Sequence, residues 1–471
     1  RFRKGFETQP QEIQVDQLPV HGEIPAWLNG TLIRSTPAQF EVNGQSYRHW
    51  FDGLAMLHAF TLNNGSVGYA NRYLQSRAYI ENNREGRIKY GEFATDPCRS
   101  LFSRVFSFFQ QSQLGGNTNV SITRLADEYI MRTEYPMSTK FDPQTLETLG
   151  VYDHGGMNGQ LTSAHPHHDF DRRTDYNYQL DLGRENAYNF YGLPGGANPK
   201  LVARIPAQKP AYLHSFGMSE QYLVLVEFPF RLPSALSLLL TNKPFIENYR
   251  WMPEEGTRFT VIDKDSGEIV ARAETEPFFC FHHVNAFVDD GELIVDLCAY
   301  DDHTIINTLY LDNLTKSDGN VAIHSFLRRY RLPLKNGTSS GGSVKFDQVS
   351  ATSFELPRFN YRPHVGKPYR YVYGAGTHSN SHDFINQLVK IDLESGETKI
   401  WHADGTYPGE PIFVGAPDAA AEDDGVILAV VLDSGSGKSF LLLLDAASFA
   451  ERARAEVPQH IPFGFHGQFF S

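Results

Sequence analysis

Cysteine, positive charge and long apolar runs are all scarce in this sequence of 471 residues, and each scarcity excludes a class of protein. The three cysteines, Cys98, Cys280 and Cys298, form no CxxC pair, which excludes a disulfide framework and a cysteine zinc site and suits a reducing compartment. The chain has 42 Lys and Arg against 55 Asp and Glu, and its net charge of −13 predicts no nucleic-acid partner. No apolar run approaches the ~18 residues that a membrane-spanning helix needs.

Helical periodicity is also scarce, and the sequence contains instead short runs of β-branched, leucine and aromatic residues. Runs of this length that are bounded by Gly, Pro, Asn and Asp are typical of β-strands. Clear examples lie at 222–228 (YLVLVEF), 293–297 (LIVDL), 369–373 (YRYVY), 426–432 (VILAVVL) and 440–444 (FLLLL). The sequence therefore predicts an all-β fold.

A turn signature recurs after such runs, in which an apolar strand end is followed by Asp or Asn, a few polar residues and a new strand. Because Asp and Asn bond to the backbone two residues on and Gly supplies a positive φ, the signature predicts hairpins. It appears at 61–67, 141–147, 262–268, 391–397 and 444–448. Repeated hairpins favour a β-propeller, although a β-sandwich with ordinary hairpins stays open at this point. The Gly- and Ser-rich stretch at 336–343 is too short for a domain linker, so we expect one domain over 1–471.

Four of the 18 histidines stand in notable sequence contexts, far apart along the chain: His165, His214, His282 and His466. None of them forms a local chelate with another. Glu355 and Glu410 fill the gap between the last two, so that the six residues follow one another at steps of 49 to 73 residues, a plausible length for one propeller blade. A further glutamate, Glu134, lies upstream in another strand-like run. One inward-facing residue per blade would bring such a series to the propeller axis.

This set of residues suits a metal centre. Histidine is the commonest metal ligand, and four neutral imidazoles leave the full charge of a divalent ion uncompensated. Carboxylates one layer further out would accept the remaining ring N–H of each ligand and offset that charge. From the spacing alone, the alternative that these are hydrogen-bonded structural residues stays open.

At these same residues the chain resembles the carotenoid cleavage oxygenase family. The resemblance runs almost from end to end of the chain. The amino-acid sequence is most similar to the animal branch of the family, which includes the β-carotene oxygenases and the retinal isomerohydrolase. The motifs that carry it are Phe51-Asp52-Gly53, Asn117-Thr118-Asn119, Ser163-Ala164-His165-Pro166, Phe281-His282-His283-Val284-Asn285, Gly409-Glu410-Pro411-Ile412-Phe413 and Phe465-His466-Gly467. The chain departs from the usual family pattern at Arg34-Ser35-Thr36-Pro37-Ala38 and at Leu54-Ala55, neither of which supplies a metal ligand in the family.

The resemblance implies a seven-bladed β-propeller with a helical and loop cap over its top face and one Fe(II) per subunit. It implies iron ligands at His165, His214, His282 and His466, and carboxylates behind them at Glu134, Glu355 and Glu410. Thr118 matches a threonine that crowds an open iron position in the family. Phe51, Tyr212 and Phe281 fall at positions that line the substrate tunnel.

The resemblance implies an enzyme that uses O2 to cleave one conjugated C=C bond of a carotenoid or apocarotenoid and forms two aldehydes or ketones. Likeness to the animal branch favours the formation of retinal. Alternatives within the family are a retinoid isomerohydrolase and a stilbenoid-cleaving oxygenase, although Gln113-Leu114-Gly115-Gly116 offers no lysine for a phenol. A non-catalytic propeller scaffold is the alternative from another class.

Because such a substrate is apolar, we expect a cytoplasmic protein that associates peripherally with a membrane surface, and no protein partner. Two inserted segments suit docking, around 100–113 (with LFSRVFSFF at 101–109) and 232–251 (with LPSALSLLLTNKPFI at 232–246). Helices packed on the core are the alternative interpretation of both segments.

Overall fold

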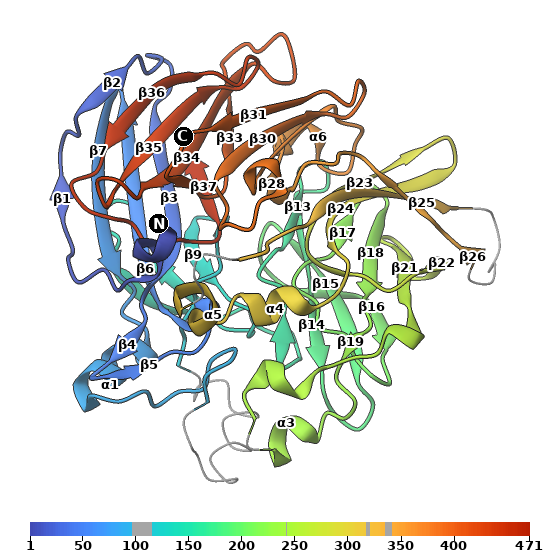
Figure 1. Cartoon of the computed structure of the whole chain (residues 1–471). Helices are drawn as coiled ribbons and strands as arrows, with labels where there is room; N and C mark the ends of the chain where they lie inside the picture. The colour runs from blue at the N-terminus through green and yellow to red at the C-terminus, as the bar shows by residue number, and fades with distance from the viewer. Residues whose placement is uncertain (97–114, 242, 317–320, 335–341) are drawn as a thin grey trace.

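The computed structural model describes residues 1–96, 115–241, 243–316, 321–334 and 342–471, and in these ranges seven β-sheets stand around a common centre (Figure 1). We call each sheet a blade and number the blades along the chain. Blade 1 comprises β1 (Gln14–Val15), β3 (Gly30–Gln39), β6 (Leu54–Asn63), β7 (Ser66–Tyr73) and β37 (Gly467–Phe470). Blade 2 comprises β8 (Ser121–Leu125), β9 (Glu128–Arg132), β10 (Ser138–Phe141) and β11 (Thr148–Tyr152). Blade 3 comprises β12 (Leu161–Thr162), β13 (His167–Asp169), β14 (Thr174–Asp181), β15 (Ala187–Pro194) and β16 (Lys200–Pro206).

Blades 4 to 7 follow the same plan of neighbouring antiparallel strands. Blade 4 comprises β17 (Gly217–Met218), β18 (Tyr222–Glu227), β21 (Thr257–Asp263), β22 (Ile269–Thr275) and β26 (Gly342–Ser343), and blade 5 comprises β23 (Phe279–Asp289), β24 (Glu292–Tyr300), β25 (Phe326–Pro333) and β27 (Phe346–Gln348). Blade 6 comprises β28 (Glu355–Arg358), β29 (Tyr371–Gly376), β30 (Gln387–Asp392) and β31 (Thr398–His402). Blade 7 comprises β2 (Val20–Gly22), β32 (Thr406–Pro408), β33 (Ile412–Gly415), β34 (Gly425–Asp433), β35 (Lys438–Asp445) and β36 (Glu451–Glu456). The predicted all-β, seven-bladed propeller is confirmed.

The hairpin turns are built as the Asp and Gly signature predicts. Between β21 and β22, Oδ1 of Asp263 accepts hydrogen bonds from the backbone N–H groups of Asp265 and Ser266. Gly267 then adopts a φ of 72°, in the left-handed region that glycine tolerates. The turn between β30 and β31 repeats this arrangement.

The two ends of the chain exchange strands to close the ring. The C-terminal β37 pairs with β3 of blade 1, where Leu32 lies opposite Phe469. The N-terminal β2 pairs with β36 of blade 7, where His21 lies opposite Arg454. The first and last blades therefore each contain strands from both ends of the chain. One domain over 1–471 stays a prediction.

The central strands are apolar on both faces because each blade packs between two neighbours. In β34, seven consecutive residues, 426–432, are buried, and β35 is nearly as continuous. Large side chains such as those of Tyr188, Phe190 and Phe216 fill the space between blades and are fully buried. Burial on two faces removes the polar alternation of a one-sided sheet, which explains the unbroken apolar runs in the sequence.

A cap of short helices and loops covers one face of the ring, as predicted. Its parts are joined by backbone contacts: the N–H of Trp50 donates to the carbonyl of Leu309, and the N–H of Ile246 donates to that of Phe93. The helices and the two small sheets of the described chain are η1 (Phe2–Phe6), η2 (Trp50–Asp52), α1 (Arg77–Glu85), α3 (Ser237–Leu240), η4 (Phe245–Asn248), η5 (Pro253–Glu255), α4 (Thr304–Thr308), α5 (Leu311–Lys316), α6 (Tyr361–His364), η6 (His378–Asn380), β4 (Glu41–Val42) with β5 (Gln45–Ser46), and β19 (Phe230–Arg231) with β20 (Arg250–Trp251). The segment predicted at 101–109 lies outside the described residues.

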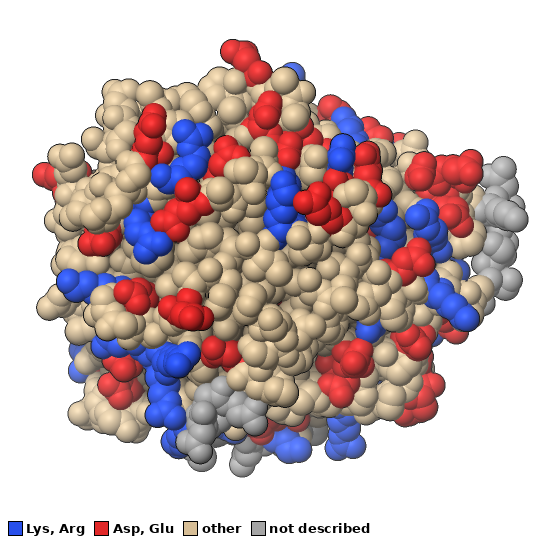
Figure 2. Space-filling model, turned by 45° about the horizontal axis from the view of Figure 1, so that its top comes forward, with Lys and Arg blue, Asp and Glu red and all other residues tan. Residues whose placement is uncertain are grey.

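Lys and Arg side chains are interspersed with Asp and Glu over the face shown in Figure 2, without a broad region of one sign. Among the described residues, no helix has the length and apolar character needed to cross a bilayer.

Candidate metal centre

Each blade contributes one of the seven histidines and glutamates that the sequence singles out. Their positions lie at or beside the innermost strands, except for Glu134, which follows β9. In blade order they are His466, Glu134, His165, His214, His282, Glu355 and Glu410. The propeller therefore brings residues separated by hundreds of positions to one place.

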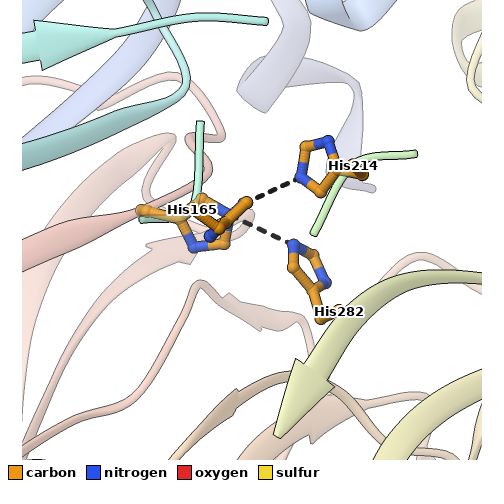
Figure 3. Close-up of side chains that lie close together, drawn as sticks. His165, His214 and His282 are labelled. Carbon is orange, nitrogen blue, oxygen red and sulfur yellow. Dashed lines mark hydrogen bonds between the residues drawn. The ribbon is translucent and has the colours of Figure 1, made fainter. Parts of the chain in front are cut away.

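The four histidines converge so that one ring nitrogen of each lies near those of the others. Figure 3 shows three of them, His165, His214 and His282. Nε2 of His165 lies 2.9 Å from Nε2 of His214, and Nε2 of His282 lies 3.2 Å from Nε2 of His466. One ligand atom from each of the four lies within 4.8 Å of all the others. His214, His282 and His466 are buried, and His165 is partly buried.

Three of the imidazoles are held from behind by a carboxylate. The pairs, with their Nδ1–oxygen distances, are Glu134 with His214 (2.6 Å), Glu355 with His282 (2.5 Å) and Glu410 with His466 (2.7 Å). Because a carboxylate accepts the Nδ1 proton, each Nε2 keeps a lone pair that points to the cluster. Among the described residues, His165 has no such carboxylate.

Local structure fixes the directions of these rings. Oγ of Ser163 accepts from the backbone N–H of His165 at 3.0 Å and donates to the carbonyl of His214 at 2.7 Å, so one buried hydroxyl joins two of the four chain segments. In β23 the register shifts between Cys280 and His283, and such a bulge redirects the side chain of His282.

The chain around His466 approaches its neighbours too closely for a side chain. A Cβ on Gly464 would lie 2.5 Å from the carbonyl oxygen of Ser35, and a Cβ on Gly467 would lie 2.7 Å from Cγ of Arg34. Glycine on either side therefore allows His466 to be packed against blade 1.

Burial disfavours the charged form of His165 and His466. It lowers the pKa of His466 to about 4, although Glu410 opposes the shift, and it lowers the pKa of His165 well below the usual range, aided by the other three histidines. Burial alone would raise the pKa of Glu410, but Arg358, His466 and Arg34 lower it overall, so this group is a carboxylate. The centre thus combines imidazoles whose protonation is disfavoured, those of His165 and His466, with the fixed negative charge of Glu410.

The arrangement fits a single transition-metal ion. With the Nδ1 protons directed at carboxylates, the facing Nε2 atoms of His282 and His466 are two hydrogen-bond acceptors in contact, which is unfavourable unless a cation lies between them. Metal–imidazole bonds of ~2.0–2.1 Å would place all four nitrogens within the observed separation. Imidazole ligands suit iron, zinc or copper.

Two cavities adjoin the cluster. The larger, about 560 Å³, is bounded by His214, His282 and His466, and its other walls are almost wholly apolar: Trp50, Phe51, Val120, Phe281, Tyr300, Ile305, Leu309, Ile323, Leu356, Ile385 and Phe465, with Glu355. The second, about 460 Å³, shares Phe51, Val120 and His214 with the first and continues along Glu92, Phe93, Asn117, Asn119, Thr133, Glu134, Tyr135, Leu161 and Phe245. The junction of the two cavities therefore lies beside the histidines.

Two of the predicted tunnel residues, Phe51 and Phe281, line these cavities, but Tyr212 does not. Tyr212 is buried, and its hydroxyl donates to Oε1 of Glu134 at 2.7 Å. Because that same oxygen accepts from His214, Tyr212 supports the carboxylate that holds this imidazole. The place of Tyr212 in the substrate tunnel stays a prediction.

Thr118 is predicted to crowd an open metal position, and that role stays a prediction. It is fully buried, its Oγ1 has no hydrogen-bond partner among the described residues, and it lines neither cavity. The wall at the junction is formed by Val120, two residues further on, whose carbonyl accepts from the backbone N–H of His466 at 3.3 Å. An apolar residue, which carries no chemical signal in the sequence, therefore lies at the wall that the two cavities share.

Two arginines behind Glu410 were not singled out from the sequence. Nε of Arg358 donates to Oε1 of Glu410 at 2.8 Å, and Nη1 of Arg34 lies 3.8 Å from Oε2 of Glu410 and donates to its backbone carbonyl. Arg358 follows Glu355 by three residues, and this proximity was the only available signal.

Known proteins resemble this chain over nearly its whole length. Residues 6–471 match the family described as retinal pigment epithelial membrane protein. A carotenoid-cleaving dioxygenase, mitochondrial, from Mustela putorius furo is 35% identical, over 98% of this chain and 95% of that protein. A β,β-carotene 15,15′-dioxygenase from Rattus norvegicus is 33% identical, over 98% and 90%.

Solved structures agree with the sequence relatives. A variant of the Synechocystis apocarotenoid oxygenase superposes with a TM-score of 0.86 at 27% identity, covering 99% of this chain and 98% of that one. The cobalt-substituted form of the Synechocystis enzyme has the same TM-score and identity and covers 100% and 98%. The chain therefore belongs to the retinal pigment epithelial membrane protein family, the family of the carotenoid cleavage oxygenases.

Proposed function

We propose that this protein is a non-haem Fe(II) dioxygenase that cleaves one conjugated C=C bond of a carotenoid or apocarotenoid with O2 and forms two aldehydes or ketones. The observation that carries the proposal is the meeting of four Nε2 lone pairs beside a long apolar cavity. Likeness to a β,β-carotene 15,15′-dioxygenase supports retinal-forming cleavage.

Each group of residues would have a distinct part. His165, His214, His282 and His466 would hold one ferrous ion per subunit, which when bound supplies the redox chemistry with O2. Glu134, Glu355 and Glu410 orient three of these rings and offset the charge of the ion. Phe51, Val120 and Phe281 exclude water from the junction and restrict a linear polyene to one path past the cluster.

The test compares the wild-type protein with His282→Ala. We expect about one iron per wild-type chain, O2 consumption with a carotenoid, and both product oxygens derived from labelled O2. We expect His282→Ala to lose iron and turnover. Full iron occupancy and normal turnover in the variant would refute the proposal, and products formed without O2 consumption would indicate the isomerohydrolase alternative.

We also propose that the segment 232–251 docks on a membrane surface from which the substrate enters. Leu236 at its start is 60% exposed, Lys243 is exposed, and Phe245 lines the 460 Å³ cavity. An apolar residue beside a cation suits the boundary between acyl chains and headgroups. Flotation with liposomes tests this: we expect Leu236→Asp to reduce the bound fraction, and a wild-type protein that stays unbound after detergent removal would disprove it. The cytoplasmic location stays a prediction.

A further inference from the structure

The seam between blades 2 and 3 contains a buried arginine. Arg132, the last residue of β9, is 6% exposed, and its Nε is buried without a hydrogen-bond partner among the described residues. In the same part of the chain its guanidinium makes no ion pair. Burial lowers the pKa of Arg132 to about 10, so the group is still a cation at neutral pH. A buried charge without a partner is costly, so this cation attracts a negative group.

The strand register places Arg132 on the face of blade 2 that meets blade 3. Arg132 lies opposite Ser121 in the pairing of β8 with β9. Residues directly opposite each other in an antiparallel pair project to the same face. Oγ of Ser121 donates to the carbonyl of Ala164, in the segment that joins β12 to β13 of blade 3. The side chain of Arg132 therefore enters the seam between the two blades.

Asp175 compensates this cation only in part. It lies in β14 of blade 3, and together with Tyr152 it opposes the lowering of the pKa of Arg132. No ion pair joins Asp175 to Arg132, and Oδ1 of Asp175 accepts instead from Nδ1 of His168 at 3.1 Å. Because burial outweighs the effect of both neighbours on the pKa of Arg132, the seam still lacks negative charge.

A second nitrogen near Arg132 is also unused. His154 follows β11 by two residues, and its Nε2 lies 2.8 Å from Oγ of Ser138. Its Nδ1 is buried and has no hydrogen-bond partner in the described chain. Burial and the charge of Arg132 lower the pKa of His154 to about 3, so the ring is neutral. When Ser138 donates to Nε2, the proton of the ring lies on Nδ1 and is free to be donated.

We propose that the seam between blades 2 and 3 binds one small monovalent inorganic anion, such as chloride, which accepts from the guanidinium of Arg132 and from Nδ1 of His154. Such an anion supplies the charge that Asp175 supplies only in part, whereas water would accept the same hydrogen bonds and leave the charge in place. Repulsion from Asp175 favours one negative charge over the two of sulfate. The anion joins the two blades and stabilises the folded protein, independently of iron and of the proposed function.

The experiment measures the thermal unfolding midpoint of the iron-loaded protein while chloride replaces methanesulfonate at constant ionic strength. A ligand that binds only the folded state raises the midpoint once its concentration exceeds the dissociation constant. We expect this rise in the wild type and its loss in Arg132→Met. The matched control is Arg124→Met, which removes an exposed arginine of β8 and should keep the rise. A wild-type midpoint that ignores chloride, or an equal rise in Arg132→Met, would overturn the inference.

The same variants make a second comparison possible. Without chloride, Arg132→Met should unfold at or above the wild-type midpoint, because it removes a buried charge that is only partly compensated. Chloride should then raise the wild type relative to the variant. His154→Phe keeps a ring beside Tyr152 but no donor, so it should weaken chloride binding about fivefold, the value of one net hydrogen bond. Unchanged chloride binding in His154→Phe would contradict the assigned site.

A crystal of the wild-type protein soaked in bromide locates the anion directly. We expect one anomalous peak beside Arg132 and His154. A peak there in a protein whose midpoint ignores chloride would mark an adventitious ion only and would overturn the inference, as would a chloride-dependent midpoint with no peak at this place. If Arg132→Met does not fold, His154→Phe and the bromide peak decide the question.

Discussion

Nε of Arg358 donates to the same oxygen of Glu410 that accepts from Nδ1 of His466, at 2.8 Å and 2.7 Å respectively. The other oxygen of Glu410 accepts from the backbone N–H of Gly467 at 2.9 Å. Neither Glu134 nor Glu355 has an arginine partner in the described chain. The carboxylate that holds His466 is therefore also bound to an arginine, Arg358. This distinguishes His466 from His214 and His282, the other two histidines that a carboxylate holds.

Replacing Arg358 should weaken metal binding through Glu410. In Arg358→Met the carboxylate of Glu410 loses one charge-assisted hydrogen bond and is held less firmly, so His466 is oriented less firmly. We expect the iron affinity to fall about tenfold, at the lower end of the ~10–100-fold range for such supporting residues. Competition with a chelator measures it. The control is Arg362→Met, which removes an exposed arginine that lies over Phe170; an equal loss in both variants would contradict the assigned role.

The carboxylate of Glu355 should be needed for more than its volume. In Glu355→Gln the amide keeps an acceptor for Nδ1 of His282 but loses the negative charge, whereas Glu355→Ala loses both. We expect iron affinity to decrease from wild type to Gln to Ala, with Ala ~10–100-fold weaker than wild type. Metal analysis after dialysis against a chelator gives the order. If the Gln and Ala variants are equal, the hydrogen bond to His282 contributes nothing.

Val120 and Thr118 should respond oppositely to substitution. Val120→Phe fills the junction between the cavities, so we expect cleavage to fall at least ~10-fold while iron content stays at the wild-type level. Thr118→Val conserves volume and removes a hydroxyl that has no partner, so turnover should stay within about twofold. Steady-state rates and iron counts on both variants decide between the two residues. A loss of turnover in Thr118→Val alone would show that Thr118 has the role that the family resemblance implies.

The sequence predicts the histidines and glutamates of the metal centre better than it predicts the residues that line the adjoining cavities. His282 stands in a recognisable motif and Glu355 continues the regular spacing of the histidines, and the propeller brings the two together because each begins or lies in an innermost strand. Val120 was missed because an apolar side chain is ordinary anywhere in a β protein, and a shift of two residues in an extended chain moves a side chain by roughly 6–7 Å. The family resemblance predicts Tyr212 in the tunnel, but it gives no sign that the hydroxyl of Tyr212 donates to Glu134 in another blade. Such contacts between blades depend on the closed ring, which no local pattern encodes.

A histidine outside the metal centre should make the fold sensitive to acid. His58 in β6 is fully buried between the hydroxyls of Thr36 and Tyr69, and burial lowers its pKa to about 3. In the unfolded chain this side chain takes up a proton near pH 6.5, whereas in the folded protein it stays neutral until far lower pH. Between these values the unfolded state binds more protons, so the free energy of unfolding decreases as the pH falls from about 6.5, by up to ~1.4 kcal/mol per pH unit.

The substitution His58→Gln should therefore reduce this slope. Glutamine can still bond to Thr36 and Tyr69 but takes up no proton, so the variant should lose less stability between pH 6.5 and pH 4.5, even if it is less stable at pH 7. Urea unfolding of the metal-free protein at several pH values measures the slope. His21→Gln, at an exposed site in β2, is the matched control and should keep the wild-type slope. Because the argument concerns the difference in protons bound and not absolute stability, an unchanged slope in His58→Gln would show that this histidine is already protonated in the folded protein or is not buried there.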